Sequence, residues 1–362
     1  MNQVSRRAFA IAAGGLAAWM SYGAPVEALA KQQLSGDGGG DKDPFAFLDP
    51  ELREAAHKIQ STGPQGGFDA KTLADARAHA PPMLEPLLSQ VPVAEHRIPG
   101  RGGMPDVTVH VINSDPKSPR PGILHTHGGG YILGSARFEV PYLQRLAQEL
   151  DCVVVTVEYR LAPETTYQGS IEDNYTALSW VHANAQEIGI DRARIALLGE
   201  SAGGGHAALL AQAARDRGEV PLVLQALIYP MLDDRTGTTH NFPAPIGSIG
   251  WNAASNRFGW QAFLGRKPGG PTAPKGAVPA RVENLKGLAP AFIGVGAVDL
   301  FVSEDIDYAR RLVEAMVPTE LLVLPGAFHG FDRVAPEATV SQVFTNAKLN
   351  ALRRAFGQPV KI

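Results

Sequence analysis

The sequence predicts an α/β fold in which helices flank a mostly parallel central sheet. Two observations support this prediction: short apolar runs recur along the chain, and longer stretches with helical spacing, such as 170–188 and 304–316, separate them. Strands buried on both faces of a sheet are continuous apolar runs, and the helices between them cover those faces. The expected strands are Gly122–His125, Cys152–Val157, Ile195–Leu198, Leu222–Tyr229, Ala291–Val295 and Leu321–Leu324.

The composition favours an ordinary globular protein with a neutral partner. The chain has 362 residues, 44% hydrophobic and 19% charged, so it can bury one large core, or one core and a small satellite. Its 33 basic and 36 acidic residues give a net charge of −3 without long runs, which directs it neither to nucleic acid nor to anionic lipid. We therefore expect a small neutral molecule as the partner.

Residues 1–30 are typical of an export signal. The segment Ser5-Arg6-Arg7-Ala8-Phe9 precedes an apolar stretch that reaches about Ala18, and Ala28-Leu29-Ala30 follows as a small-x-small cleavage site. The arginine pair resembles a twin-arginine signal, which exports folded proteins, so we expect a periplasmic or secreted protein. The alternative is a membrane anchor, which needs roughly 18 or more strongly apolar residues. This run is shorter, so we expect no stable anchor; whether the signal is cleaved stays open.

The rest of the chain divides into a linker, a helical segment and a main domain. Residues 31–43 are predicted to be a flexible linker, because glycine is costly to order without packing in return. Residues 44–90 have helical spacing, with Asp49 as a cap and Pro50 in the first turn. The main domain is 91–362. Its segment 233–270 is long and rich in Gly, Pro and aromatic residues, so we expect it to form a helical cap together with 44–90.

A strand pair is expected at the start of the main domain. After Pro99 the segment Val107–Ile112 alternates with a period of two, which is typical of a half-buried strand. A turn over 113–121 follows it.

The sequence Gly199-Glu200-Ser201-Ala202-Gly203 lies between an apolar run and a helical stretch of small residues. A sharp strand-to-helix turn exposes a serine as a nucleophile, and its neighbours two residues away must be small enough not to collide. The N-terminus of the following helix favours developing negative charge. The alternative, a chance match in a glycine-rich chain, is disfavoured by this setting, and Ser201 is the predicted nucleophile.

The sequence His127-Gly128-Gly129-Gly130 follows the expected strand 122–125. The amides of Gly128, Gly129 and Gly130, together with that of Ala202, can bind the oxyanion of a tetrahedral intermediate. A plain turn and a phosphate cradle are the alternatives, and the cradle is disfavoured because neither glycine-rich phosphate-binding pattern is present. Which two of the three glycines donate stays open.

An acid and a base are expected after the serine, each on a loop that follows a later strand. Asp299 follows the run 291–295, and His329 follows 321–324, which gives the chain order Ser, Asp, His. In this order His329 is the general base and Asp299 fixes its tautomer. The alternatives are that Asp299 caps a helix and that His329 is an ordinary loop residue.

Other polar residues are assigned structural roles. Asp305 and Asp307 are expected to be solvated on a helix face, and Glu304 either caps the same helix or lies behind the triad. His125 is expected to be a strand residue near the glycine loop. Cys152, the one cysteine, is predicted to be buried and inert. Paired Cys and His spacing is missing from the sequence, so no metal and no cofactor are expected.

Four segments resemble the bacterial esterases related to hormone-sensitive lipase. They are H-G-G-G at 127–130, Y-R-L-A-P-E at 159–164, G-E-S-A-G-G at 199–204 and H-G-F at 329–331, and the resemblance extends from about residue 90 to the end. Two stretches depart from the family pattern. Leu300–Ser303 follow Asp299 where many relatives have Pro and a second Asp, and Thr165–Tyr167 replace the usual sequence after the Y-R-L-A-P-E segment.

The resemblance implies an α/β-hydrolase fold with an eight-stranded sheet and a helical cap formed partly by the N-terminal segment. It implies hydrolysis of small esters with short to medium acyl chains, with Ser201, Asp299 and His329 as the triad and the glycine loop and Ala202 as the oxyanion hole. An amidase or peptidase on the same residues, or a ligand-binding module without catalysis, are the alternatives. The natural substrate and the oligomeric state cannot be read from the sequence.

Overall fold

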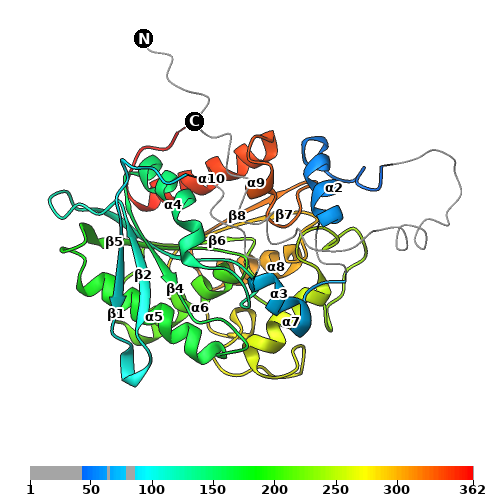
Figure 1. The fold of residues 1–362 in the computed structure, drawn as a ribbon, viewed down its shortest axis with the longest axis horizontal. Coiled ribbons are helices and arrows are strands. Elements are labelled where there is room, and N and C mark those ends of the chain that lie inside the picture. The colour runs from blue at the N-terminus through cyan, green and yellow to red at the C-terminus, as the bar shows by residue number, and fades with distance from the viewer. Residues whose placement is uncertain (1–42, 63–65, 79–85, 362) are drawn as a thin grey trace, which may run out of the picture.

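The computed structural model describes residues 43–62, 66–78 and 86–361. The expected signal peptide 1–30 lies outside the described residues, as do 31–42 of the expected linker and 63–65 and 79–85 of the expected cap segment. Eight strands form one sheet (Figure 1). They are β1 Val93–Ile98, β2 Val107–Ile112, β3 Arg120–Thr126, β4 Val153–Glu158, β5 Ile190–Glu200, β6 Leu224–Ile228, β7 Ala291–Gly296 and β8 Thr319–Leu324.

The sheet confirms the predicted fold class. Its strand order is β1-β2-β4-β3-β5-β6-β7-β8, with β1, β2 and β4 paired antiparallel and every pairing from β4 through β8 parallel. The carboxyl ends of parallel strands meet at one edge of a sheet, so the loops that follow β3, β5, β7 and β8 lie together there. All of the predicted catalytic residues lie on these loops.

The strand pair that begins the domain is formed by β1 and β2, and β1 was not among the expected strands. It lies before Pro99, and five of its six residues are exposed or half-buried. An edge strand that contains Glu95 and Arg97 lacks the apolar run by which the inner strands are found. The turn over 113–121 leads from β2 to β3, which is not a neighbour of β2 in the sheet.

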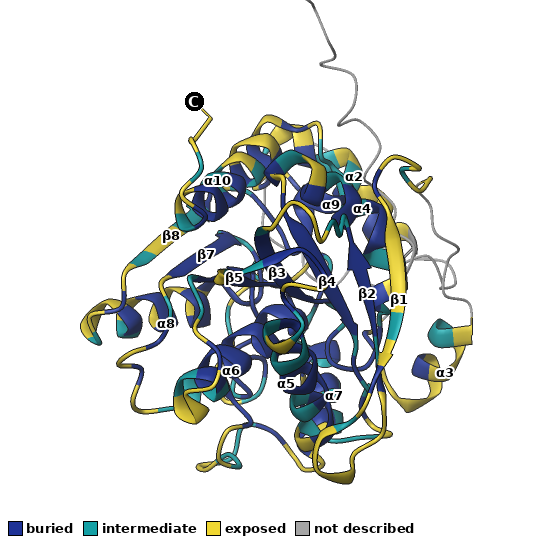
Figure 2. Cartoon of the chain, turned by 90° about the vertical axis from the view of Figure 1, so that its left-hand side faces the viewer, coloured by how far each residue is buried: buried dark blue, intermediate teal, exposed yellow. Residues whose placement is uncertain are grey.

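Helices cover both faces of the sheet, as Figure 2 shows. One face is covered by α4, α9 and α10 and the other by α5, α6 and α8, and each face has its own buried apolar cluster. Neighbouring residues of β5 point to opposite faces, so Leu197 belongs to one cluster and Leu198 to the other. The helices are α2 Arg53–Thr62, α3 Ala70–Ala78, α4 Ala136–Leu150, α5 Tyr167–Ala183, α6 Ala202–Arg217, α7 Ala253–Leu264, α8 Val302–Glu314, α9 Phe331–Val334 and α10 Thr339–Ala355.

Cys152 precedes β4 and is buried, as predicted. Burial raises the pKa of its thiol, so the reactive thiolate is disfavoured.

The N-terminal helical segment begins as expected. Asp49 caps a short turn, accepting a hydrogen bond from the amide of Glu51 (2.9 Å), and Pro50 is its first residue. Among the described residues, no helix combines the length and apolar character needed to cross a membrane.

A third apolar cluster lies apart from the two faces of the sheet. It brings Phe68 from the N-terminal segment together with Trp251, Trp260 and Phe263 from the 233–270 segment, and it includes Ala202 beside the predicted nucleophile. The amide of Phe68 donates a hydrogen bond to the Ser255 hydroxyl (3.1 Å), which ties the two segments at the N-terminal end of α7.

Candidate active site

Ser201 occupies the turn between β5 and α6, as the sequence predicts. Its φ of 57° lies in the left-handed region, which is uncommon for a residue with a side chain. The first turn of α6 packs so closely that side chains do not fit there. A Cβ atom on Gly203, Gly204 or Gly205 would lie 2.0 Å from the Thr126 carbonyl oxygen, 2.7 Å from the Pro230 Cβ and 2.1 Å from the Tyr131 hydroxyl, respectively.

The structure brings Ser201, His329 and Asp299 into one hydrogen-bonded row. The Nε2 atom of His329 lies 3.0 Å from the Ser201 hydroxyl, and its Nδ1 atom lies 2.8 Å from the Asp299 Oδ2 atom. All three side chains are buried. With Nδ1 protonated against the carboxylate, Nε2 keeps a lone pair for the serine hydroxyl, which is the geometry of a base beside a nucleophile.

Three further contacts hold the row in place. The second oxygen of Asp299, Oδ1, accepts a hydrogen bond from the Phe301 amide (2.9 Å), so this carboxylate caps the following turn as well as orienting the histidine. The rings of Phe301 and Tyr229 pack edge-on against the His329 ring at 5.2 Å and 4.8 Å between centroids. The imidazole is therefore fixed in both position and tilt.

The glycine loop follows β3 and lies against Ser201, the predicted nucleophile. A Cβ atom on Gly128 would lie 3.5 Å from the Ser201 Cβ. Within the described part of the chain, the amides of Gly128, Gly129 and Gly130 donate no hydrogen bond to another residue. Amides that are free of internal acceptors and close to a nucleophile are suited to bind an oxyanion.

His127 anchors the start of this loop. Its ring stacks on Tyr159 at 4.2 Å between centroids, and the Tyr159 hydroxyl donates to the His127 carbonyl oxygen (2.7 Å). The first residue of the H-G-G-G segment thus positions the backbone of the three glycines.

Behind the nucleophile, Glu200 and His125 form a buried pair that sequence reasoning did not identify. The Nε2 atom of His125 lies 2.8 Å from Glu200 Oε2, and its Nδ1 atom lies 2.8 Å from the Thr156 hydroxyl. Burial by itself would raise the pKa of Glu200, but His125, and then Arg333 and Lys348, lower it to about 2. The sequence signal for this pair is His125 itself, which follows the apolar residues of its strand. A fully buried imidazole needs polar partners.

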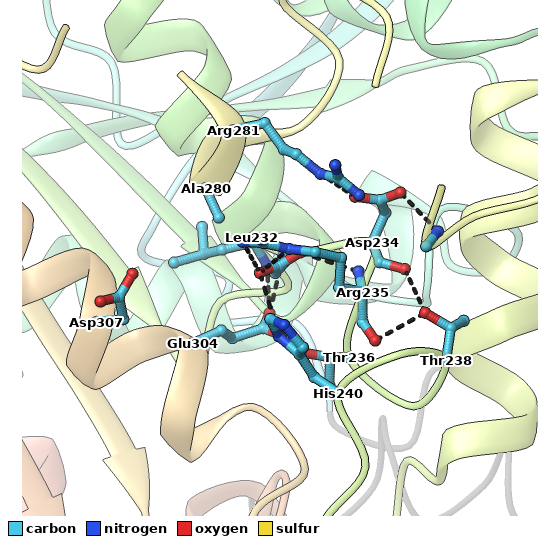
Figure 3. A network of polar contacts seen from close by, with 12 residues as sticks. Leu232, Asp234, Arg235, Thr236, Thr238, His240, Ala280, Arg281, Glu304 and Asp307 are labelled. Atoms are coloured by element: carbon cyan, nitrogen blue, oxygen red, sulfur yellow. Dashed lines mark hydrogen bonds and ion pairs between the residues drawn. The ribbon is translucent and has the colours of Figure 1, made fainter. Parts of the chain in front are cut away.

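Glu304 is buried and binds the start of the 233–270 segment. Its carboxylate accepts hydrogen bonds from the amides of Leu232 (2.6 Å) and Asp233 (3.1 Å) and from the hydroxyl of Thr236 (Figure 3). Burial and the nearby charge of Asp233 raise the pKa of Glu304, while the three hydrogen bonds oppose that rise. Because Glu304 lies near the start of α8, it links this segment to the helix that follows Asp299.

A second buried carboxylate, that of Asp234, joins the two ends of the same segment. It pairs with the Arg281 guanidinium (2.7 Å) and accepts a hydrogen bond from the Gly269 amide (2.8 Å), as Figure 3 shows for the ion pair. The segment therefore leaves and rejoins the main domain at one place.

The prediction that Asp305 is solvated is wrong. Asp305 is fully buried, and neither of its carboxyl oxygens has a hydrogen-bond partner among the described residues. It lies three and seven residues before Tyr308 and Leu312, which are also buried, so helical spacing turns it toward the core. Burial, and then the charges of Glu304 and Asp299, raise its pKa well above the usual range, which favours the neutral acid. Asp307 is solvated, as predicted, and pairs with an arginine on the same helix.

Among the residues that the structure describes, no three His, Cys, Asp or Glu side chains are grouped so that they could hold a metal ion.

Comparison with known proteins places this site in a family. The family described as "alpha/beta hydrolase fold" matches residues 123–333. Two esterases of Mycobacterium tuberculosis are similar in sequence. Esterase LipI is 37% identical over 236 residues, which cover 64% of this chain and 72% of LipI. Carboxylesterase NlhH is 37% identical over 284 residues, which cover 76% of this chain and 85% of NlhH.

A solved structure of a bacterial heroin esterase is similar in fold as well as in sequence. It superimposes with a TM-score of 0.77 at 37% identity and covers 86% of this chain and 99% of its own.

A buried histidine beside the site generates a test of stability against pH. His206 lies on α6 among the rings of Tyr131, Tyr159 and Phe263, and neither ring nitrogen has a hydrogen-bond partner among the described residues. Burial, and then the neighbouring His127, lower its pKa from 6.5 to about 3. Between about pH 3 and pH 6.5 the imidazole is therefore neutral in the folded protein, whereas it is protonated in the unfolded chain.

Replacement of His206 by Phe should make the protein less sensitive to acid. Because the folded-state pKa is depressed, the stability from neutral His206 is complete above pH 6.5 and is lost as pH falls toward 3, by about 3 kcal/mol between pH 6.5 and pH 4. Urea unfolding of both proteins across this range measures the effect. The same dependence of the free energy of unfolding on pH in wild type and His206→Phe would contradict this prediction.

Proposed function

Since this chain belongs to the α/β-hydrolase family, among the bacterial esterases related to hormone-sensitive lipase, we propose that its ester hydrolysis proceeds through an acyl-enzyme on Ser201. The chain is a serine carboxylesterase, as are named relatives that match most of its length. The proposal concerns which residues perform the reaction and which esters they accept. The observation that supports it best is the row in which His329 bridges Ser201 and Asp299 at 3.0 Å and 2.8 Å.

The reaction follows from this geometry in two halves. The Ser201 oxygen attacks the carbonyl carbon of the ester while His329 Nε2 takes the proton of the Ser201 hydroxyl. Asp299 offsets the positive charge of the resulting imidazolium. The same nitrogen returns the proton to the leaving alcohol, and the acyl group remains on Ser201. Water, deprotonated by His329, then attacks the acyl-enzyme and releases the acid.

The carbonyl oxygen carries the negative charge of each tetrahedral intermediate. We propose that the Ala202 amide and two amides of the loop Gly128, Gly129 and Gly130 donate to it. Removal of one such donor typically costs about 3 kcal/mol of transition-state stabilisation.

We further propose that residues 44–90 and 233–270 act as a helical cap and that the substrate is a small neutral ester with a short to medium acyl chain. The third apolar cluster supports this assignment, because it joins Phe68 and Trp251 to Ala202, next to the nucleophile. A site bordered by aromatic rings suits an uncharged acyl group.

We also propose that residues 1–30 direct export by the twin-arginine route to the periplasm or beyond. Arg6-Arg7 and the small-x-small site at 28–30 support this assignment. The proposed route delivers the enzyme already folded.

Substitution of the triad should abolish turnover without unfolding the protein. Ser201→Ala should lower kcat/KM for p-nitrophenyl acetate about 10⁴-fold or more, and Asp299→Asn should lower it on the order of 10³-fold to 10⁴-fold. The matched control is Asp307→Asn on the exposed face of α8, which should keep wild-type rates. Thermal unfolding verifies that each variant is folded. Wild-type rates for folded Ser201→Ala would contradict the mechanism.

The acyl preference should peak at short chains. With p-nitrophenyl esters of two to twelve carbons, we expect the highest kcat/KM at about two to six carbons, because a capped pocket rewards apolar contact only until it is full. The corresponding acetanilide should react far more slowly. Equal rates for ester and anilide would instead identify an amidase, and a maximum at ten or more carbons would contradict the short-chain assignment.

The export proposal is tested with a reporter enzyme fused after residue 43. The reporter should reach the periplasm of a bacterial host, and replacement of Arg6 and Arg7 by Lys should retain it in the cytoplasm. Unchanged export of the lysine variant would contradict the twin-arginine route, and a reporter that stays in the membrane fraction would favour an anchor.

A further inference from the structure

The dipeptide Gly250-Trp251 joins the two halves of the proposed catalytic apparatus. A Cβ atom on Gly250 would lie 2.9 Å from the His329 carbonyl oxygen and 3.4 Å from the His329 Cβ, so this backbone packs directly on the base. The ring of Trp251 reaches the glycine loop, since a Cβ atom on Gly130 would lie 2.1 Å from the Trp251 Cη2 atom. These two adjacent residues therefore extend from the histidine to the glycine loop.

The indole of Trp251 is packed between the two cap segments. It contacts Phe68 of the N-terminal segment at 5.8 Å between ring centroids, and a Cβ atom on Gly259 of α7 would lie 3.5 Å from its Cζ2 atom. The residue keeps 8% of its surface exposed, whereas Trp260 on α7 is completely buried. Trp251 thus keeps a small accessible area, and Trp260 does not.

A chain of buried hydrogen bonds fixes the orientation of this ring. The Trp251 Nε1–H group donates to Asn256 Oδ1 (3.1 Å), and the Asn256 side-chain amide donates to the Thr236 carbonyl oxygen (2.8 Å). The Thr236 hydroxyl in turn donates to Glu304 on α8 (Figure 3). Asn256, Thr236 and Glu304 are all buried, so each of these bonds forms away from water and is costly to break.

We propose that Trp251 is the wall that limits the length of the acyl chain, and that Asn256 is a positioning residue that holds this wall against the glycine loop. The inference rests on the proposed acyl-enzyme mechanism. In that mechanism the leaving alcohol faces His329 Nε2, which returns its proton, while the carbonyl oxygen faces the glycine loop. The acyl substituent lies on the side away from the histidine nitrogen, where the indole meets Gly130.

The length of the acyl chain that fits is then set by the size of residue 251. Each methylene that gains a buried place contributes about 0.8 kcal/mol, which is about fourfold in kcat/KM. Removal of the indole makes room for several methylenes, so long acyl chains gain while acetate does not.

The test compares kcat/KM for p-nitrophenyl decanoate and p-nitrophenyl acetate within each protein, because this ratio does not depend on the fraction of folded enzyme. Trp251→Ala should raise the ratio 10-fold or more, and Trp251→Phe should raise it less. The matched control is Trp260→Phe, the same exchange in the same apolar cluster, which should leave the ratio within about twofold. A series of acetates with longer alcohols should show no comparable gain.

Asn256→Leu tests the positioning role, because leucine is close in volume and cannot accept the indole hydrogen bond. We expect its decanoate to acetate ratio to rise three- to tenfold. Asn252→Leu removes the amide that caps α7 at the Ser255 amide, and serves as the control for a generally loosened cap. An equal rise in both asparagine variants would overturn the positioning role.

If Trp251→Ala hydrolyses esters with the wild-type ratio of decanoate to acetate kcat/KM, Trp251 does not limit the acyl chain. The same conclusion would follow if kcat/KM rose only for the acetates with longer alcohols. These results differ from failure of the proposed mechanism, in which folded Ser201→Ala would keep its activity or the wild type would cleave no ester.

Discussion

The turn between β5 and α6 is the constraint on which the rest of the site depends. Ser201 occupies this turn with a left-handed backbone, and the helix that follows approaches β3 and the end of β6 closely. Parallel strands then supply the other groups, because the loops after β3, β7 and β8 open at the same edge of the sheet. Ser201, Asp299 and His329 are far apart in the sequence, yet the His329 ring lies within hydrogen-bonding distance of both other side chains.

Four buried carboxyl groups lie around this turn, and three of them have different partners. Asp299 contacts the His329 ring, Glu200 pairs with His125, and Glu304 accepts hydrogen bonds from amides at the start of the 233–270 segment. Hydrogen bonds or ion pairs offset the burial of all three. Asp305 has no such partner among the described residues, and burial raises its pKa, which favours the neutral acid. The local environment therefore lowers the pKa of Glu200 and raises the pKa of Glu304 and Asp305.

Sequence reasoning predicted the features that depend on local pattern. The inner strands, the G-x-S-x-G turn around Ser201 and the positions of Asp299 and His329 after their strands could be predicted, because apolar runs and chain order express them directly. The edge strand β1 could not, since its charged residues conceal the strand period. Asp305 was placed in solvent because a helical pattern alone does not show which face is covered.

Contacts between segments that are distant in the sequence could not be predicted from it. The approach of Trp251 to Gly130, the hydrogen bonds of Glu304 and the pairing of His125 with Glu200 depend on tertiary distances that leave no periodic signal. The composition of the 233–270 segment predicts an unusual loop, but which of its aromatic rings lies against the glycine loop depends on tertiary packing.

The glycines that begin α6 have a consequence for how the protein folds. Gly203, Gly204 and Gly205 together weaken this end of the helix by about 3 kcal/mol relative to alanine, yet a single methyl group at any of them would meet neighbouring atoms. This turn therefore gains its stability from docking onto strands β3 and β6 rather than from its own helical preference. The left-handed backbone of Ser201 depends on the same docking, so the position of this serine is determined by the assembled sheet and not by its own turn.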